Sequence, residues 1–139
     1  MGYDTIEYEV CEPGIGVLTL NRPEKYNAVN QHMMMELEHF WSERENDTDT
    51  RVIILKGGGE KGFCAGLDMT EAMGELRHGM NSHQFYHAQT RMSNLMLKMR
   101  QAHQIIVCIV HGAAAGIGLS FALSSDVRVI SREDRKSVV

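Results

Sequence analysis

The most constraining pattern in this sequence is a strand-like apolar run followed by a glycine-rich segment, and it occurs twice. Residues 52–55 form the first run and residues 57–68 the glycine-rich segment behind it, and residues 105–110 and 112–118 repeat the arrangement. Continuous β-branched runs are typical of strands buried on both faces of a sheet. Because helical spacing follows each glycine-rich segment, the order predicts an α/β fold with parallel strands joined by crossover helices.

Periodicity places the other elements of the N-terminal half. Alternation of polar and apolar residues predicts a hairpin made of residues 3–10 and 16–20. A helix is predicted to begin near residue 31, because apolar residues recur there on one helical face. That face consists of Met33, Leu37, Phe40 and Trp41.

The C-terminal half is predicted to contain three helices and a last strand. A short helix is expected over residues 70–78, and a helix and a strand over residues 117–124 and 126–130. Between them a long helix is expected to begin with Ser82 as its cap. Its predicted apolar face consists of Phe85, Ala88, Met92, Leu95, Met96 and Met99.

Composition argues against several function classes. The 139 residues carry a net charge of −4, so no general basic field attracts nucleic acid or an anionic membrane. No apolar run approaches the ~20 residues that a membrane-spanning helix needs. Three cysteines without a C-x-x-C pair argue against a disulfide framework, and seven histidines show no metal-ligand spacing. We therefore expect a cytoplasmic protein that holds no metal.

The glycine-rich segments are the candidate site. Glycines that follow buried strands let backbone N–H groups approach a ligand closely, and two such amides could stabilise one oxyanion. The alternative is that the glycines only relieve crowding between strand and helix. Cys64 lies in the first segment, where it is either a reactive thiol or, as we expect, a small buried apolar residue.

A second chemical interpretation rests on Ser120. The stretch at residues 118–122 is similar to a nucleophile elbow, in which a serine lies between a strand and a helix. Such a serine hydrolase needs an acid and then a histidine later in the chain. Asp126 and Asp134 follow, but no histidine does, so this interpretation is incomplete.

Three motifs resemble the enoyl-CoA hydratase/isomerase (crotonase) superfamily, in the family's order and spacing. They are residues 21–29 (NRPEKYNAV), 62–69 (GFCAGLDM) and 110–119 (VHGAAAGIGL), and Ser124-Ser125-Asp126 continues the last. The resemblance implies a ββα spiral, of which residues 1–139 would be the N-terminal part, incomplete at the C-terminus. It also implies assembly as a homotrimer or hexamer.

The resemblance also implies a substrate and a site. The substrate is a fatty-acyl thioester of coenzyme A, with no prosthetic group, and its carbonyl oxygen would lie between the backbone amides of Ala65 and Ile117. The residues implied to border coenzyme A are Lys25, Tyr26 and Ala28 near the pantetheine and phosphates, and Leu67, Asp68 and Met69 near the adenine. Candidates for the acyl pocket are Met69, Met73 and Leu119.

Departures from the family pattern narrow the expected reaction. Hydratases of the family use two glutamates; Ser120 replaces the first, and the second would fall at or beyond Val139. A serine hydroxyl cannot serve as a general base near neutral pH without help. We therefore expect an isomerase-like acyl-CoA protein rather than a simple hydratase, with a catalytically inactive coenzyme A-binding or structural relic as the alternative. Other carboxylates near the first segment, expected to be solvated, are Glu60, Glu71 and Glu75.

Overall fold

The structure is a computed structural model that describes residues 2–132. The strands of this part of the chain are β1 (Ile6–Glu12), β2 (Ile15–Leu20), β3 (Val52–Gly57), β4 (Gly62–Cys64), β5 (Ile105–Val110), β6 (Ala113–Ala114) and β7 (Val127–Ile130). The helices are the 3-10 turn η1 (Pro23–Lys25), α1 (Gln31–Arg44), α2 (Met69–Arg77), α3 (Ser82–Gln101) and α4 (Ile117–Leu123). The predicted elements are present, with boundaries shifted by a few residues.

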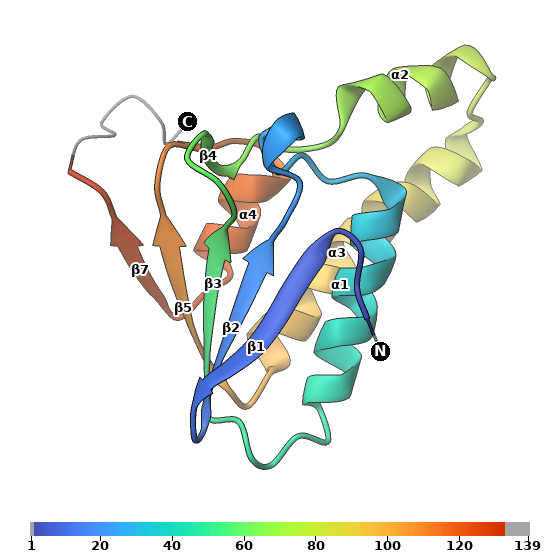
Figure 1. The fold of residues 1–139 in the computed structure, drawn as a ribbon. Helices are drawn as coiled ribbons and strands as arrows, with labels where there is room; N and C mark the ends of the chain where they lie inside the picture. Colours follow the sequence, from blue (N-terminus) through green and yellow to red (C-terminus); the bar gives the residue numbers. More distant parts are fainter. Residues whose placement is uncertain (1, 133–139) are drawn as a thin grey trace.

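The main sheet has the order β1-β2-β3-β5-β7 (Figure 1). The β1–β2 hairpin is antiparallel, whereas β2, β3, β5 and β7 run parallel to their neighbours. This arrangement confirms the predicted α/β class and its crossover helices. No helix in the described residues is long and apolar enough to cross a bilayer.

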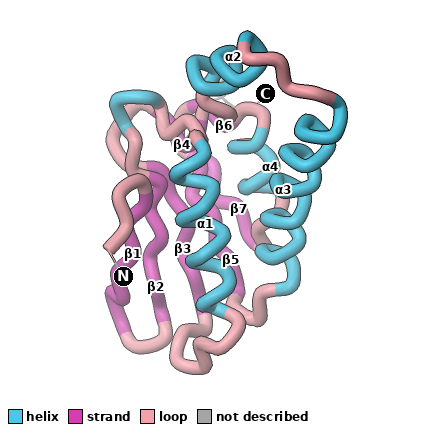
Figure 2. Tube along the Cα trace, turned by 90° about the vertical axis from the view of Figure 1, so that its right-hand side faces the viewer, coloured by secondary structure: helices cyan, strands magenta, loops and turns pink. Residues whose placement is uncertain are grey.

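Helices α1, α3 and α4 lie on one face of the main sheet, as the side view in Figure 2 shows. Along β3, Ile53 and Leu55 are buried, whereas Val52 and Ile54 are only half-buried. On β5 the side chain of Ile105 is 52% exposed. The prediction that these strands are buried on both faces is therefore wrong for the described residues, because helices lie over one face only.

The two long helices contribute differently to the core. The predicted apolar face of α1 is fully buried, which confirms it. On α3 only Leu95 and Met99 are buried, and Phe85 is 54% exposed, because the first half of α3 extends beyond the sheet beside α2 (Figure 1). The cap of α3 is Asn81 rather than Ser82, because the Asn81 side chain accepts the Gln84 N–H and Gln84 returns the contact in a capping box.

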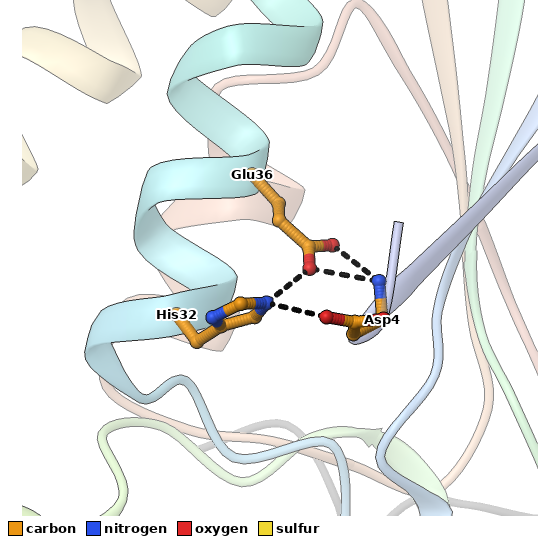
Figure 3. A group of neighbouring side chains, drawn as sticks. All are labelled: Asp4, His32 and Glu36. Carbon is orange, nitrogen blue, oxygen red and sulfur yellow. Dashed lines mark hydrogen bonds and ion pairs between the residues drawn. The ribbon is translucent and has the colours of Figure 1, made fainter. Parts of the chain in front are cut away.

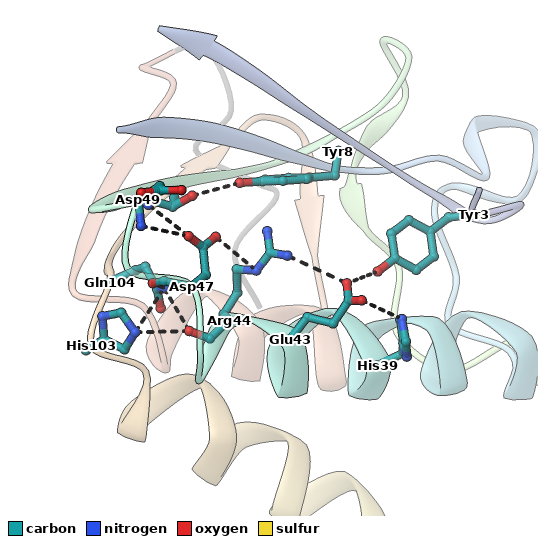
Figure 4. Close-up of polar contacts among 10 residues, drawn as sticks. Tyr3, Tyr8, His39, Glu43, Arg44, Asp47, Asp49, His103 and Gln104 are labelled. Atoms are coloured by element: carbon teal, nitrogen blue, oxygen red, sulfur yellow. Dashed lines mark hydrogen bonds and ion pairs between the residues drawn. The ribbon is translucent and has the colours of Figure 1, made fainter. Parts of the chain in front are cut away.

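The C-terminal end of α1 is fastened by Arg44 (Figure 4). Its guanidinium lies 4.7 Å from the ring centre of Tyr8 and 4.6 Å from that of Phe40, and 3.5 Å from the Asp47 carboxylate. Its carbonyl accepts the Gln104 side-chain N–H at 3.0 Å. Arg44 therefore ties α1 to β1 and to the connection that leads into β5.

The N-terminal segment is tied to α1 by a second polar group (Figure 3). The Glu36 carboxylate accepts the backbone N–H groups of Asp4 and Thr5 at 2.8 and 3.2 Å. His32 Nε2 lies 3.1 Å from Asp4 Oδ2 and 2.7 Å from Glu36 Oε1. The segment before β1 is thereby held along the first turns of α1.

Candidate functional site

The two glycine-rich segments lie side by side. The structure pairs β4 with β6 in a short parallel sheet, in which Gly62 opposes Ala113 and Cys64 opposes Ala114. Gly118 extends the contact, since a Cβ on it would lie 2.4 Å from the Cys64 carbonyl oxygen. The glycines therefore do relieve crowding, but they do so between the two segments, which brings both to one place.

Gly66 and Gly116 bring the two segments together beside the cavity. Gly66 has φ +107° and Gly116 φ +55°, conformations that residues with a Cβ rarely adopt. A Cβ on Gly66 would lie 3.1 Å from the Ala115 carbonyl oxygen, and one on Gly116 would lie 3.8 Å from the Gly66 Cα. Each glycine directly precedes a residue whose amide is a candidate donor.

The free amide of the first segment is not the predicted one. The Ala65 N–H donates to the Tyr26 carbonyl at 3.0 Å, so it is already used within the chain. Leu67 forms a parallel bridge with Val29, in which the bonds run from Val29 N–H to Gly66 and from Asp68 N–H to Val29. A bridge of this type directs the N–H of Leu67 away from Val29. Within residues 2–132 that N–H has no hydrogen-bond partner.

The second segment keeps its predicted donor. Ile117 is the first residue of α4, and the first N–H groups of a helix have no partner within the helix. The Ile117 N–H makes no hydrogen bond to any residue that the structure describes, whereas Gly118 and Ser120 donate to Ala115 and Gly116. Within residues 2–132, the Leu67 and Ile117 amides are thus both unpaired where the two segments meet.

A cavity of about 520 Å³ lies between these segments, α3 and α4. Its lining residues are Ala65, Gly66, Leu67, Met69, Gln89, Met92, Ser93, Met96, Gly116, Ile117 and Ser120. None of these side chains carries a carboxyl, imidazole, thiol or amine. The cavity can therefore accept an apolar group and offer hydrogen bonds, but its described lining supplies no general base.

Ser120 borders the cavity from α4. Its hydroxyl donates to the Gly116 carbonyl at 3.4 Å, a contact back to the preceding helical turn. No histidine lines the cavity among the described residues. The nucleophile-elbow interpretation gains no support from this environment, and its second candidate acid, Asp134, lies outside the described residues, as does Val139.

The other carboxylates near the first segment lie elsewhere. Glu71 and Glu75 line a neighbouring cavity of about 250 Å³ between α1, α2 and α3. There the Glu71 carboxylate accepts the backbone N–H of Gln31 at 2.8 Å, and the Glu75 carboxylate accepts the side-chain N–H of Gln31 at 3.1 Å. Glu60 is exposed and lines neither cavity.

Of the residues expected to border coenzyme A, Leu67 and Met69 line the larger cavity; they are 39% and 63% exposed. Lys25 and Tyr26 are exposed on the adjoining turn, and Lys61 Nζ lies 5.0 Å from the centre of the Tyr26 ring. The side chain of Ala28 is buried and does not reach this cavity.

The Asp68 carboxylate already has partners within the chain. Its Oδ2 lies 3.0 Å from Arg22 Nη2, and its Oδ1 accepts the N–H groups of Thr70 and Glu71 at the start of α2. Burial alone would raise the pKa of Asp68, but the Arg22 guanidinium and the two amides outweigh burial and hold the pKa below its ordinary value. Asp68 is thus an ionised structural group.

Asn27 holds the first glycine-rich segment in place, a role that the sequence did not predict. It is fully buried with φ +56°, and its side-chain oxygen accepts the Arg22 N–H at 2.8 Å. Its side-chain nitrogen donates to the Gly58 and Gly62 carbonyls at 3.0 and 3.1 Å. A signal was present, because an asparagine beside a turn tolerates the left-handed conformation, but two of its three partners, Gly58 and Gly62, lie over 30 residues away.

The thiol and the histidines do not take part in this site. Cys64 is fully buried, and burial raises its pKa to about 11, so it is a neutral apolar side chain, as expected. His83 and His87 lie exposed on α3, with their Nε2 atoms 3.0 Å apart. The ligand atoms of Asp4, His32 and Glu36 lie within 4.8 Å of one another and could approach a cation, on α1 and the N-terminal segment rather than at the cavity.

Comparison with known proteins places this chain in a family. The family model for enoyl-CoA hydratase/isomerase matches residues 11–137. The chain belongs to the enoyl-CoA hydratase/isomerase family. A 1,2-epoxyphenylacetyl-CoA isomerase of Escherichia coli (strain K12) is 32% identical over 126 residues, which are 87% of this chain and 45% of that protein. A short-chain-enoyl-CoA hydratase of Clostridium acetobutylicum is 32% identical over 124 residues, 89% of this chain and 46% of that protein.

Solved structures of the enoyl-CoA hydratase/isomerase family confirm the fold. The crystal structure of an enoyl-CoA hydratase from Bacillus anthracis matches with a TM-score of 0.81 and 31% identity, over 91% of this chain and 47% of that one. A putative enoyl-CoA hydratase from Streptomyces coelicolor A3(2) matches with a TM-score of 0.84 and 27% identity, over 93% and 46%. The chain spans a little under half the length of these relatives, which fits the predicted N-terminal part of a crotonase fold.

Proposed function

We propose that this chain, residues 1–139, is an acyl-CoA-binding part of such an enzyme and holds the thioester carbonyl oxygen between the N–H groups of Leu67 and Ile117. The single observation that carries the proposal is that these two amides, unpaired within the described residues, border one cavity. Leu67 replaces Ala65 as the first donor, because the Ala65 N–H is bonded to Tyr26.

The chemistry follows from where charge develops. Removing a proton from C2 of an acyl thioester moves the electron pair onto the carbonyl oxygen and gives an enolate. Two preset N–H donors stabilise that oxygen more than they stabilise the neutral carbonyl, and removal of one such donor typically costs ~3–4 kcal/mol. Methionines 69, 92 and 96 provide an adaptable apolar wall for the acyl chain.

For the coenzyme A moiety we propose the exposed turn next to the cavity. Tyr26 offers an exposed ring, and Lys25 and Lys61 place two cations near it that suit phosphate groups. We withdraw Asp68 as a ligand contact, because Arg22 and α2 already occupy its carboxylate.

Among the reactions of the family we propose an isomerase-like one rather than simple hydration. Double-bond isomerisation moves one proton from C2 to C4, and a single group or a water molecule can carry it. Hydration in the family uses two glutamates, and the first of these positions is Ser120, whose hydroxyl cannot act as a base unaided. The trimer or hexamer implied by the resemblance stays a prediction.

Binding without turnover is the second candidate. It is favoured by one observation, that the described cavity lining contains no group that ionises near neutral pH. Under this interpretation the chain polarises the thioester but does not accelerate proton transfer.

Deuterium exchange separates these candidates. The chain is incubated with butyryl-CoA in D₂O, and loss of the C2 proton signal is followed by NMR, beside assays with 3-enoyl-CoA and crotonyl-CoA. We expect saturable butyryl-CoA binding, C2 exchange above the rate without protein, and conversion of 3-enoyl-CoA but not of crotonyl-CoA. Binding without exchange would support the second candidate, and no binding at all would refute both.

Ser120→Ala is the matched variant. An isomerase-like protein should keep most of its exchange, because Ser120 is not the base. If this variant instead abolished hydrolysis of a simple ester that the wild type cleaves, the serine hydrolase interpretation would return. Efficient hydration of crotonyl-CoA would contradict our assignment of Ser120.

A further inference from the structure

A partly buried charged pair joins Asp68, the residue after Leu67, to Arg22 in the turn before α1. Arg22 Nη1 donates to the Ala28 carbonyl at 2.6 Å, and Nη2 lies 3.0 Å from Asp68 Oδ2. Both side chains of the Arg22–Asp68 pair are only 13% exposed. One guanidinium therefore joins the turn before α1 to the first glycine-rich segment, 46 residues further along the chain.

Arg22 contacts one residue on each side of the Val29–Leu67 bridge. Ala28 precedes Val29, and Asp68 follows Leu67, so the guanidinium spans the two strands of the Val29–Leu67 bridge. That bridge consists of two backbone bonds, Val29 N–H to Gly66 at 2.8 Å and Asp68 N–H to Val29 at 2.9 Å. The peptide that carries the Leu67 N–H also carries the Gly66 carbonyl, so rotation of this peptide would break the bond from the Val29 N–H. The peptide of that Val29 N–H carries in turn the Ala28 carbonyl that Arg22 contacts.

Asp68 has a second attachment that restricts it further. Its other oxygen accepts the N–H groups of Thr70 and Glu71 at 3.1 and 3.4 Å and so begins α2. Arg22 uses one guanidinium nitrogen for the Ala28 carbonyl and the other for Asp68, and the planar guanidinium fixes the direction between these two contacts, which a single ammonium would not. The carboxylate is thereby held from the bridge side and from the helix side at once.

We propose that Arg22 and Asp68 are positioning residues that set the direction of the Leu67 N–H, and hence how strongly a bound thioester carbonyl is polarised. This inference rests on the proposed function, since it explains what orients the Leu67 N–H, one of the two donors proposed there. Neither side chain lines the cavity that holds Leu67 and Ile117, so their effect on a ligand there is transmitted through the backbone.

Asp68→Asn and Arg22→Gln test the proposal with acetoacetyl-CoA as the probe. Asparagine is a good helix cap, so Asp68→Asn keeps the start of α2 and removes the charge pair. If the two amides polarise its carbonyl, bound acetoacetyl-CoA will form an enolate, whose near-ultraviolet absorption reports carbonyl polarisation per bound molecule. At saturation we expect both variants to lose enolate absorption by about tenfold, less than the loss of a whole donor. The dissociation constant of free coenzyme A should change less than twofold.

Amide hydrogen exchange supplies a readout that needs no ligand. Both variants should exchange faster at the Val29 and Asp68 amides, which make the bridge. Glu45→Gln is the control, because it breaks the exposed Lys98–Glu45 pair, 3.6 Å long, away from the cavity. This control should change neither the enolate absorption nor the exchange at the bridge.

The outcomes distinguish the two proposals. Unchanged enolate absorption in both variants, or unchanged exchange at Val29 and Asp68, would overturn the positioning role. If the wild type itself binds no acetoacetyl-CoA or shows no enolate, the proposed function fails, and the exchange rates still decide whether the pair holds the bridge. Loss of free coenzyme A affinity in parallel with the enolate would indicate a merely structural role and would also overturn the proposal.

Discussion

The two glycine-rich segments meet at one cavity but are held there by different means. The first, residues 57–68, depends on side chains from a distant turn, because Asn27 bonds Gly62 and Arg22 bonds Asp68. The second, residues 112–118, depends on close backbone packing against the first, as Gly118 shows against Cys64. Polar side chains thus hold the segment that carries the Leu67 N–H, whereas close backbone packing at glycines holds the segment that carries the Ile117 N–H. Four predictions test this difference, from the largest expected effect to the smallest.

Gly118→Ala attacks the backbone contact of the second segment. The added Cβ would lie 2.4 Å from the Cys64 carbonyl oxygen, which is too close for any real contact, so backbone must move. We expect the free energy of unfolding to fall by about 3 kcal/mol, measured by urea denaturation. Gly74→Ala is the control, because a Cβ there meets nothing within 4 Å, and it should raise stability by about 0.5–1 kcal/mol. Equal effects of the two changes would contradict the comparison.

Asn27→Ala attacks the side-chain hold of the first segment. It removes three hydrogen bonds at a fully buried residue and leaves alanine in a left-handed conformation. We expect a loss of about 2–3 kcal/mol in the free energy of unfolding. Asn21→Ala removes only an exposed contact with Glu7 and should stay within about 0.5 kcal/mol of the wild type. A small change in the free energy of unfolding would show that the first segment keeps its conformation without the Asn27 hydrogen bonds.

Acid titration tests the charge in the first segment. The pKa of Asp68 lies below its ordinary value of 3.8 in the folded chain, so the ionised form stabilises the fold above that value. This stabilisation is lost as the pH falls from 3.8 through the lower folded pKa. Asp68→Asn should therefore flatten the fall in stability over that range, measured by thermal unfolding at a series of pH values. A profile parallel to that of the wild type would show that the pair carries no net stabilisation.

Thiol labelling probes the contact between the segments without changing stability. A Cβ on Gly118 would lie 3.0 Å from Cys64 Sγ, so Cys64 is covered by the second segment. Because burial raises the pKa of Cys64 to about 11 and that of Cys108 to about 12, both should resist a thiol reagent at pH 8, whereas exposed Cys11 reacts at once. Mass spectrometry measures the modified positions. Faster labelling of Cys64 than of Cys108 would mean that the segments separate while the sheet stays intact.

Much of the fold was predictable because the signals are local. The apolar face of α1, the hairpin and the parallel strands follow from periodicity and from the two strand-and-glycine units. The prediction of strands buried on both faces failed at Ile105, because a β-branched run does not tell which face a helix will cover. The β4–β6 pair was missed because each partner is too short for any repeat to show.

The candidate site was predictable in its place but not in its donor. The motifs predicted the site at residues 62–69 and 110–119, and the cavity lies between these two segments. Which amide of the first segment is free depends on the bonds of Ala65 to Tyr26 and of Val29 to Gly66, which join residues more than 30 positions apart. Motif spacing cannot supply those bonds.

The sequence by itself determined the fold class, the family and the two glycine-rich segments, because periodicity, residue types and motif order are properties of the chain alone. Only the tertiary structure decided that Leu67 rather than Ala65 offers an N–H without a partner among the described residues, and that Asp68 pairs with Arg22. The physical reason is that a backbone donor has no sequence signature of its own. Every residue except proline carries the same N–H, and its availability depends on which distant acceptor the fold places in front of it.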